Sequence, residues 1–249
     1  MTRYPLATTI DSVEYRFERV LKEDFFSVNA LYRDHEGRGM VLKISDFRFI
    51  GGLLLRPAAV YMSRHELRMY KKLSENPGIP KAGPAYGWRG FYHEYAEGQT
   101  LHFLDENKSE IPSEFFDHLL AMMLAIHAKD VIYLDSNKRG NIILGPDGLP
   151  KLIDFQISIN FGWTRPFFAW LFKALAHEDI YHVYKHKRNF GHALSPEESK
   201  FAQRSKLSKV VGRGIGNPYR WLKRKIYPSG GSDVIWYKRK KTDHVPSVD

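Results

Sequence analysis

Asp135, Asn141 and Asp154, in the middle of the chain, have the side chains and spacing to take part in phosphoryl transfer. That reaction needs a carboxylate beside the acceptor hydroxyl, and a second carboxylate with an amide oxygen on the magnesium ions that bridge the phosphates. Asp135 and Asn141 alone could equally be turn residues. Asp154 is harder to explain in this way, because it stands in the apolar run 152–155, where an unpaired charge is costly.

The two segments that carry these residues resemble a known pair of motifs. They read Asp135-Ser-Asn-Lys-Arg-Gly-Asn141-Ile-Ile-Leu and Lys151-Leu-Ile-Asp154-Phe-Gln156, and they resemble the catalytic loop and metal-binding motif of the protein-kinase-like superfamily. The resemblance implies that Asp135 is the catalytic base and that Asn141 and Asp154 bind Mg²⁺. Lys138 or Arg139 would then steady the transferring phosphate.

The resemblance extends over roughly residues 13–190 and implies an ATP site. Val41-Leu42-Lys43-Ile44 looks like the strand motif whose lysine holds the nucleotide phosphates, and Glu66 is placed on the next predicted helix to pair with Lys43. Residues 92–98 would form the hinge that holds adenine. Further expected nucleotide contacts are Ser27 beside the phosphates and Glu94, Tyr95 and Ala96 at the hinge.

Several departures from the usual kinase pattern narrow the resemblance. Tyr133-Leu134 replaces the usual His-Arg pair, Gln156 replaces the usual glycine, and one extra residue separates Asp135 from Asn141. The turn 22–28, which corresponds to the glycine-rich phosphate loop of kinases, contains no glycine. These features argue against a regulated eukaryotic-type protein kinase. The chain looks most like the bacterial lipopolysaccharide-core sugar kinases and the RIO-like kinases, and residues 179–188 resemble a late helix of the former.

The first hundred residues predict strands and one helix. Residues 15–21, 28–32 and 40–44 have strand patterns, with a turn-rich segment at 34–39. Helical spacing of apolar residues runs through 56–73, where the one proline lies at the start. Residues 85–95 predict two strands around Gly90.

The remainder predicts one short hairpin within a mainly helical region. We expect a helix over 113–127 with Ser113 as its N-cap, strands at 141–144 and 151–153, and helices beyond them. The prediction is an α+β, bilobal protein-kinase-like fold. Its N-lobe would span residues 1–97, its C-lobe residues 98–228 and a basic tail residues 229–249.

Composition and charge indicate the cellular compartment and the kind of surface that the protein contacts. The chain has no cysteine, which excludes disulfides and cysteine–zinc sites and suits a reducing compartment. No secretory signal is expected from its first residues, and no apolar stretch reaches the roughly 20 residues of a membrane span. Residues 201–249 contain 12 Lys/Arg against 3 Asp, so they carry +9 of the net charge of +10. We therefore expect a cytoplasmic protein whose basic C-terminus contacts an anionic membrane peripherally.

The aromatic segment 161–176 has two interpretations. The default places Trp163, Phe167, Phe168, Trp170, Leu171 and Phe172 in the core of the C-lobe. The alternative is a face that touches lipid.

Three functions remain open on these patterns. The first is an ATP- and Mg²⁺-dependent kinase that phosphorylates a hydroxyl of a glycolipid or sugar at the cytoplasmic membrane face. The others are an atypical Ser/Thr protein kinase and a pseudokinase scaffold. A nucleic-acid-binding module is the weakest option, since it rests on charge alone.

Overall fold

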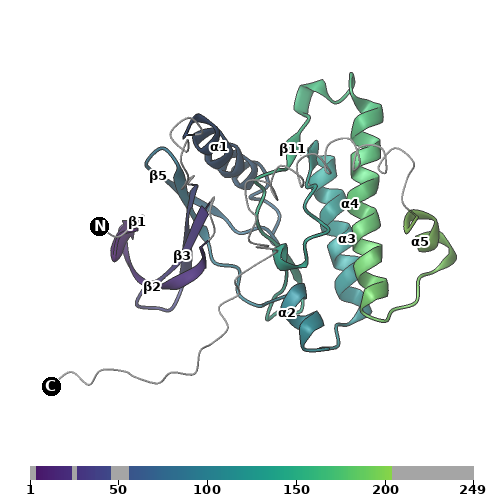
Figure 1. Ribbon diagram of the computed structural model, residues 1–249, viewed down its shortest axis with the longest axis horizontal. Helices are drawn as coiled ribbons and strands as arrows, with labels where there is room; N and C mark the ends of the chain where they lie inside the picture. The colour runs from purple at the N-terminus through teal and green to yellow at the C-terminus, as the bar shows by residue number, and fades with distance from the viewer. Residues whose placement is uncertain (1–3, 24–26, 46–55, 204–249) are drawn as a thin grey trace, which may run out of the picture.

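A curled antiparallel sheet of six strands forms the N-terminal part of the chain (Figure 1). The computed structural model describes residues 4–23, 27–45 and 56–203. The strands follow the spatial order β1-β2-β3-β4-β6-β5. They are β1 (Ala7–Ile10), β2 (Val13–Glu23), β3 (Ser27–Arg33), β4 (Gly39–Ser45), β5 (Ala82–Tyr86) and β6 (Gly90–Glu94). Register shifts between β2 and β3 act as bulges and bend this edge of the sheet.

The two faces of this sheet have different partners because side chains alternate along each strand. One face carries Ala30, Leu42 and Tyr92 into a small apolar cluster with residues of β1 and β2. The other face carries Lys43 and Phe91, which are directly paired across β4 and β6. The sheet thus places a lysine on the same face as a large buried aromatic side chain.

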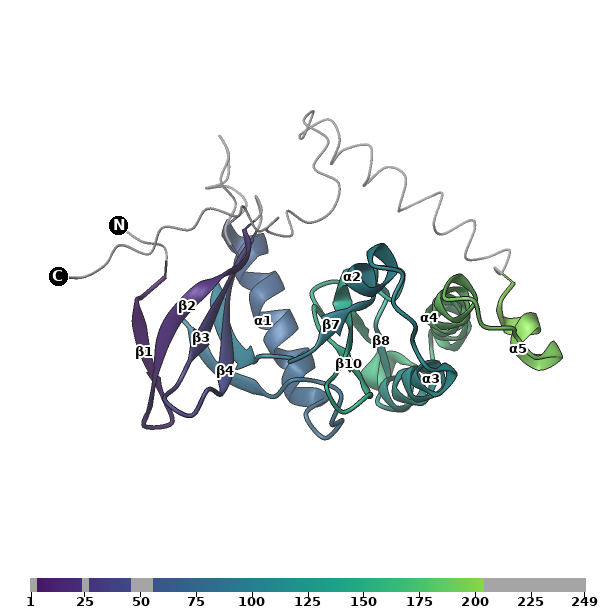
Figure 2. The same ribbon diagram turned by 90° about the horizontal axis from the view of Figure 1, so that it is seen from below.

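Helix α1 (Arg56–Lys72) covers the face that carries Lys43. It lies between the sheet and the rest of the molecule (Figure 2). Its buried positions include Ala59, Ser63, Glu66 and Tyr70, which recur at helical spacing. The predicted helix at 56–73 is therefore confirmed, and its apolar stripe contains one glutamate.

The C-terminal part combines helices with short strand pairs. The helices are α2 (Leu101–Glu106), α3 (Ser113–Ala128), α4 (Ala169–Asn189) and α5 (Pro196–Phe201). The strands are β7 (Gln99–Thr100), β8 (Val131–Ile132), β9 (Ile142–Leu144), β10 (Pro150–Leu152) and β11 (Ile159–Asn160). Two 3₁₀ turns, η1 (Arg139–Asn141) and η2 (Gly162–Thr164), complete the described elements. The structure is therefore α+β, as the sequence predicted, and the hairpin β9–β10 is confirmed.

Two local predictions were wrong. Ser113 is not an N-cap but the first residue of α3, and Pro112 precedes it without a side-chain capping bond. The turn between β5 and β6 centres on Gly87 and not on Gly90, which is the first residue of β6. Gly87 has φ +54°, a conformation that favours glycine.

The aromatic segment divides between core and surface. Phe161 and Phe172 are buried with Ile132 in a cluster of their own, as the default prediction required. Trp163, Phe167, Phe168 and Trp170 are exposed, so the core prediction was wrong for these four side chains. The difference follows from position, because Phe161 and Phe172 pack against Ile132 of β8, and Leu171 is partly buried against the same cluster.

Two expectations concern membranes. Within residues 4–23, 27–45 and 56–203, no helix has both the length and the apolar character that crossing a bilayer requires. The predicted basic membrane contact begins at residue 201 and lies almost wholly outside the described residues, as does the predicted tail 229–249.

Candidate active site

Lys43 joins side chains from three separate elements at the centre of the molecule. Its Nζ lies 2.8 Å from Glu66 Oε1 on α1 and 2.8 Å from Asp154 Oδ1, just after β10. Lys43 and Glu66 are both buried. The structure thus contains the Lys43–Glu66 ion pair that the sequence predicted, and it adds a second carboxylate.

The charges in this cluster strongly perturb one another. Burial alone would lower the pKa of Lys43, but the carboxylates of Asp154 and Glu66 raise it above its usual range. Burial would raise the pKa of Asp154, yet Lys43 and Lys138 hold it below its usual range. Burial raises the pKa of Glu66 to about 7, against the opposing effect of Lys43. At neutral pH Lys43 is therefore protonated and Asp154 is ionised.

The main chain at Asp154 is fixed in an uncommon conformation. Asp154 has φ +67°, and its N–H donates to the Tyr70 hydroxyl at 3.0 Å. Tyr70 is fully buried, stacks on His93 at 5.0 Å and meets the Phe155 ring edge-on at 5.2 Å. A left-handed non-glycine residue costs on the order of 1–3 kcal/mol and persists only where its surroundings enforce it. Tyr70, which sequence reasoning missed, supplies that constraint from α1.

Asp135, Lys138 and Asn141 meet beside Asp154. Asn141 Nδ2 donates to Asp135 Oδ2 at 2.6 Å. Lys138 Nζ lies 3.3 Å from Asp154 Oδ2 and 3.5 Å from Asp135 Oδ2. Burial raises the pKa of Asp135, with Lys138 opposing this shift. Four of the predicted residues therefore share one site, with Lys138 between the two carboxylates.

Two successive turns accommodate the extra residue between Asp135 and Asn141. The N–H of Lys138 donates to the Asp135 carbonyl at 2.9 Å, and the N–H of Asn141 donates to the Lys138 carbonyl at 2.9 Å. The Asn141 carbonyl then accepts from the Ile153 N–H at 3.1 Å. The last bond ties the Asn141 loop to the strand that delivers Asp154.

The donor set around Asp154 suits a hard divalent cation. Carboxylate and amide oxygens are the ligands that Mg²⁺ prefers, and Asp154 and Asn141 supply one of each. The Lys138 ammonium already lies between the Asp135 and Asp154 carboxylates, which indicates that this position attracts a cation. Among the described residues no cluster of three or more His, Asp or Glu side chains is arranged as a metal site. The fit therefore rests on the Asn141–Asp154 pair.

Comparisons with known proteins were also made for the whole chain. No protein-family model matches the chain, and no curated protein is significantly similar to it.

Asp179, on α4, organises the loop that leads into Asp135, although the sequence assigned it no role. Its carboxylate accepts from the N–H groups of Tyr133 and Leu134 at 2.9 and 3.0 Å. It also accepts from Ser136 Oγ at 2.9 Å and from His127 Nε2 at 3.1 Å. These bonds hold Leu134 at φ +66°, a strained conformation for a branched residue. No signal in the sequence indicated this role, because the partners of Asp179 lie more than 40 positions away.

The structure also places two other predicted residues, Arg139 and Ser27. The Arg139 guanidinium pairs with Asp105 on α2, so the structure brings Lys138 into the site and not Arg139. Ser27 is buried at the start of β3 opposite Ser45. Directly paired residues share a sheet face, so Ser27 lies on the face that carries Lys43.

The predicted hinge residues lie at the end of β6 and in the connection to the C-terminal part: Glu94 is the last residue of β6, and Tyr95 and Ala96 follow it. The Tyr95 N–H donates to the Gly39 carbonyl at 2.9 Å. The Glu94 carbonyl accepts from His93 Nδ1–H at 2.7 Å. Ala96 is buried. Two of the main-chain groups expected to contact adenine therefore already have protein partners.

Proposed function

We propose that this chain is an ATP-dependent phosphotransferase with a bilobal protein-kinase-like fold, with lobes at 1–97 and 98–228. The observation that carries the proposal is the Lys43 ammonium at 2.8 Å from both Glu66 and Asp154. A buried ion network of this kind is weak as a source of stability, because desolvation opposes it. The network is well suited to position the Lys43 ammonium for binding a phosphate and the Asp154 carboxylate for binding a metal ion.

Each member of the site has a distinct role in this proposal. Lys43, held by Glu66, binds the phosphates of ATP, and Lys138 neutralises charge on the transferred phosphoryl group. Asp154 and Asn141 would hold Mg²⁺, which would neutralise phosphate charge. Asp135 accepts a hydrogen bond from the acceptor hydroxyl and takes its proton. The raised pKa of Asp135 suits a general base.

The adenine contact is assigned to Ala96 in preference to Glu94 and Tyr95. The Glu94 carbonyl and the Tyr95 N–H already bond to His93 and Gly39. Ala96 directly follows Tyr95 and is buried.

The acceptor that we propose is a sugar hydroxyl of a glycolipid, as in a lipopolysaccharide core. This choice rests on the sequence resemblance to lipopolysaccharide-core sugar kinases. A hydroxyl of a protein, as for RIO-like kinases, is the competing acceptor.

The test is magnesium-dependent ATP binding and turnover. ATP with Mg²⁺ should raise the melting temperature of the protein, and acceptor pools should stimulate phosphate transfer. Asp154→Asn should abolish turnover with little effect on the fold, because the amide has the same shape. Asp147→Asn is the matched control, since Asp147 is exposed in the β9–β10 turn.

The outcomes separate the alternatives. ATP binding without transfer to any acceptor would support a pseudokinase scaffold. A melting temperature that does not respond to ATP and Mg²⁺ would overturn the nucleotide assignment itself.

A further inference from the structure

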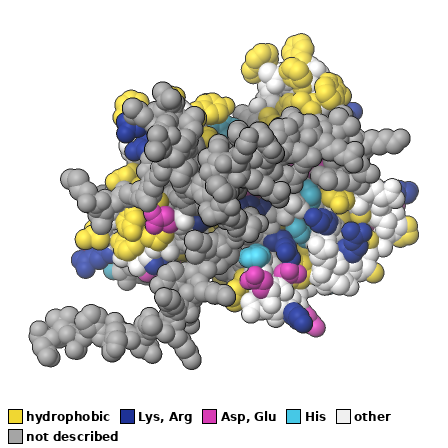
Figure 3. Space-filling view, viewed as in Figure 1, with side chains coloured by type: hydrophobic (Ala, Val, Ile, Leu, Met, Phe, Trp, Pro, Cys, Tyr) yellow, Lys and Arg dark blue, Asp and Glu magenta, His cyan; other side chains and the backbone are white. Residues whose placement is uncertain are grey.

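Four large aromatic side chains project from one end of the molecule. They belong to the segment before α4 and to its first turn, and we call them the aromatic tip. Their exposed fractions are 83% for Trp163, 74% for Phe167, 48% for Phe168 and 61% for Trp170. Figure 3 shows hydrophobic side chains gathered at the end of the molecule where α4 begins in Figure 1. Such a concentration is unusual for a surface that meets only water.

The structure fixes the outward direction of the tip. Phe161 and Phe172, on either side of it, are buried in a common cluster. Between them, Arg165 pairs with Asp130 at 2.6 Å, and its guanidinium lies 4.2 Å from the centre of the Phe172 ring. The inward positions of the segment are therefore filled, and the tip cannot turn inward without displacing Phe161 or Phe172.

The segment that carries the tip contains charge of one sign, and the Asp130 carboxylate that pairs with Arg165 comes from outside it. Residues 155–177 contain no Asp or Glu, whereas Arg165 and Lys173 are both exposed. Tryptophan and phenylalanine next to basic residues are characteristic of surfaces that enter the headgroup region of a bilayer. We infer that the aromatic tip docks on an anionic lipid bilayer, with its rings at the boundary between headgroups and acyl chains.

The geometry favours a bilayer over a second copy of the chain or another protein. A stable protein interface takes about 20–30 residues from each partner, whereas the tip consists of four side chains on one short segment. Insertion into a bilayer needs only a few aromatic side chains, because the lipid adapts to their shape. The tip also begins nine positions after Asp154. If the proposed function holds, docking would bring the site close to acceptors in the membrane, but docking itself does not depend on catalysis.

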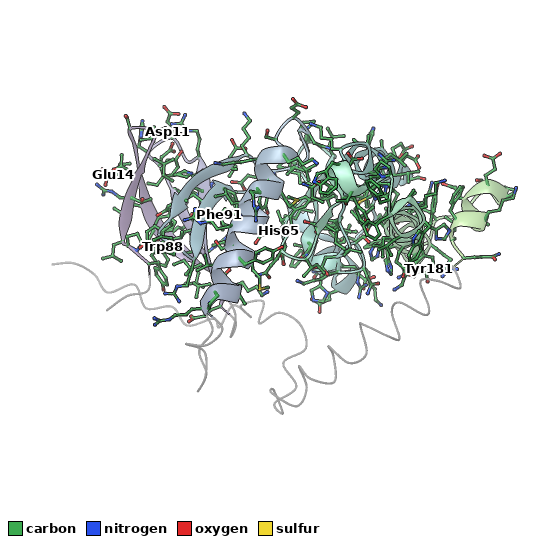
Figure 4. All side chains as sticks on the ribbon, turned by 90° about the horizontal axis from the view of Figure 1, so that it is seen from above. Asp11, Glu14, His65, Trp88, Phe91 and Tyr181 are labelled. Atoms are coloured by element: carbon green, nitrogen blue, oxygen red, sulfur yellow. The ribbon has the colours of Figure 1, made fainter. Side chains whose placement is uncertain are left out.

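Vesicle binding by the full-length protein tests the inference. The vesicles contain equal parts of phosphatidylglycerol and phosphatidylcholine, and the variant combines Trp163→Ser, Phe167→Ser and Trp170→Ser. Its partitioning should be weaker by about tenfold or more, since burying even part of three rings exceeds the 1.4 kcal/mol that tenfold represents. Trp88→Ser is the matched control. Trp88 is 78% exposed, and it lies by the sheet, away from α4 (Figure 4).

Salt and lipid-borne quenchers separate the tip from the basic C-terminus. Contacts by the C-terminus should weaken as salt rises, whereas binding through inserted rings should persist. At high salt, where contacts of the C-terminus with its Trp221 and Trp236 are weakened, brominated lipids should quench the tryptophan fluorescence of the wild type and of Trp88→Ser, and should quench the triple variant much less. Circular dichroism and the melting temperature should show that the triple variant folds normally, because the replaced side chains are exposed.

Three results would overturn the inference. They are wild-type protein that does not bind these vesicles, a triple variant that binds like the wild type, and an equal loss in Trp88→Ser. A different outcome would be that neither protein binds vesicles, while the wild type forms dimers and the triple variant is monomeric. In that case the aromatic tip would contact a second copy of the chain and not a bilayer.

Discussion

Asp154, which is partly exposed, and Asp179, which is buried, are two carboxylates that are satisfied in different ways. Asp154 lies between two ammonium groups, Lys43 at 2.8 Å and Lys138 at 3.3 Å. Asp179 is 1% exposed and accepts instead from two main-chain N–H groups, a hydroxyl and an imidazole. Flexible cationic side chains surround the first, and the backbone fixes most of the surroundings of the second.

This difference indicates a division between reacting and supporting groups. Lysine side chains can move to a phosphate and leave Asp154 for a metal ion, so the cluster around Asp154 can exchange partners. The N–H groups around Asp179 cannot move without refolding residues 133–136, which lead into Asp135. On the proposed function, the first region carries the chemistry and the second holds it in place.

The largest expected effect is on the reacting side. Asp135→Ala should lower phosphoryl transfer by about 10²–10⁴-fold, because the acceptor loses its base. ATP affinity, measured by calorimetry, should change little, since the proposed function assigns Asp135 to the acceptor and not to the nucleotide. Asp147→Ala should leave both quantities close to those of the wild type. Equal losses of ATP affinity and of phosphoryl transfer in Asp135→Ala would show that Asp135 has a structural role and is not the base.

Removing Asp179 should instead act on stability. Asp179→Ala leaves several buried donors without an acceptor and should lower the free energy of unfolding by about 3–5 kcal/mol. Asp179→Asn keeps one acceptor oxygen and should cost less. Urea denaturation measures both values. A loss below about 1 kcal/mol for the alanine variant would contradict the supporting role.

Low pH should lower the stability of the folded protein, because His186 resists protonation in the folded state. Its Nε2–H donates to the Ser136 carbonyl at 2.8 Å, and burial lowers its pKa to about 4, with that carbonyl opposing the shift. The unfolded chain therefore takes up this proton first as the pH falls. Stability should decline between about pH 6.5 and 4, on the order of 3 kcal/mol from this residue.

Comparison of variants isolates this contribution. His186→Gln should make the stability curve flatter over that range, whereas His35→Gln, at an exposed position, should not. If the free energy of unfolding of His186→Gln depends on pH as steeply as that of the wild type, His186 is not the source of the pH dependence.

The smallest expected effect concerns Glu66. Burial raises its pKa to about 7, so it becomes ionised, and holds Lys43 more strongly, as the pH rises through that value. Wild-type transfer should therefore rise between about pH 6 and 8. Glu66→Gln should lower transfer at pH 8 by about tenfold, the equivalent of one charge-assisted hydrogen bond. Its pH profile should be flatter, and an unchanged profile would show that another group titrates.

The sequence alone was enough to place Lys43, Glu66, Asp135, Asn141 and Asp154 in order on their elements. Alternating strands, a long helical stripe and a short hairpin are local patterns, and each shows which side chains share a face. The Lys43–Glu66 pair itself was predicted from the resemblance to the kinase motifs, and the structure contains it. Its lysine lies on a strand, and its glutamate lies on the helix that packs against that strand.

Only the tertiary structure decided which distant partners these side chains meet. Lys138 and Arg139 are adjacent cations, but one turns toward Asp154 and the other toward Asp105. Asp179 reads as an ordinary helical residue until α4 packs beside residues 131–136. Phe161 and Trp163 are similar in type, yet only Phe161 faces Ile132 and is buried. Local periodicity specifies the face of an element, whereas the partner on that face depends on how separate elements pack together.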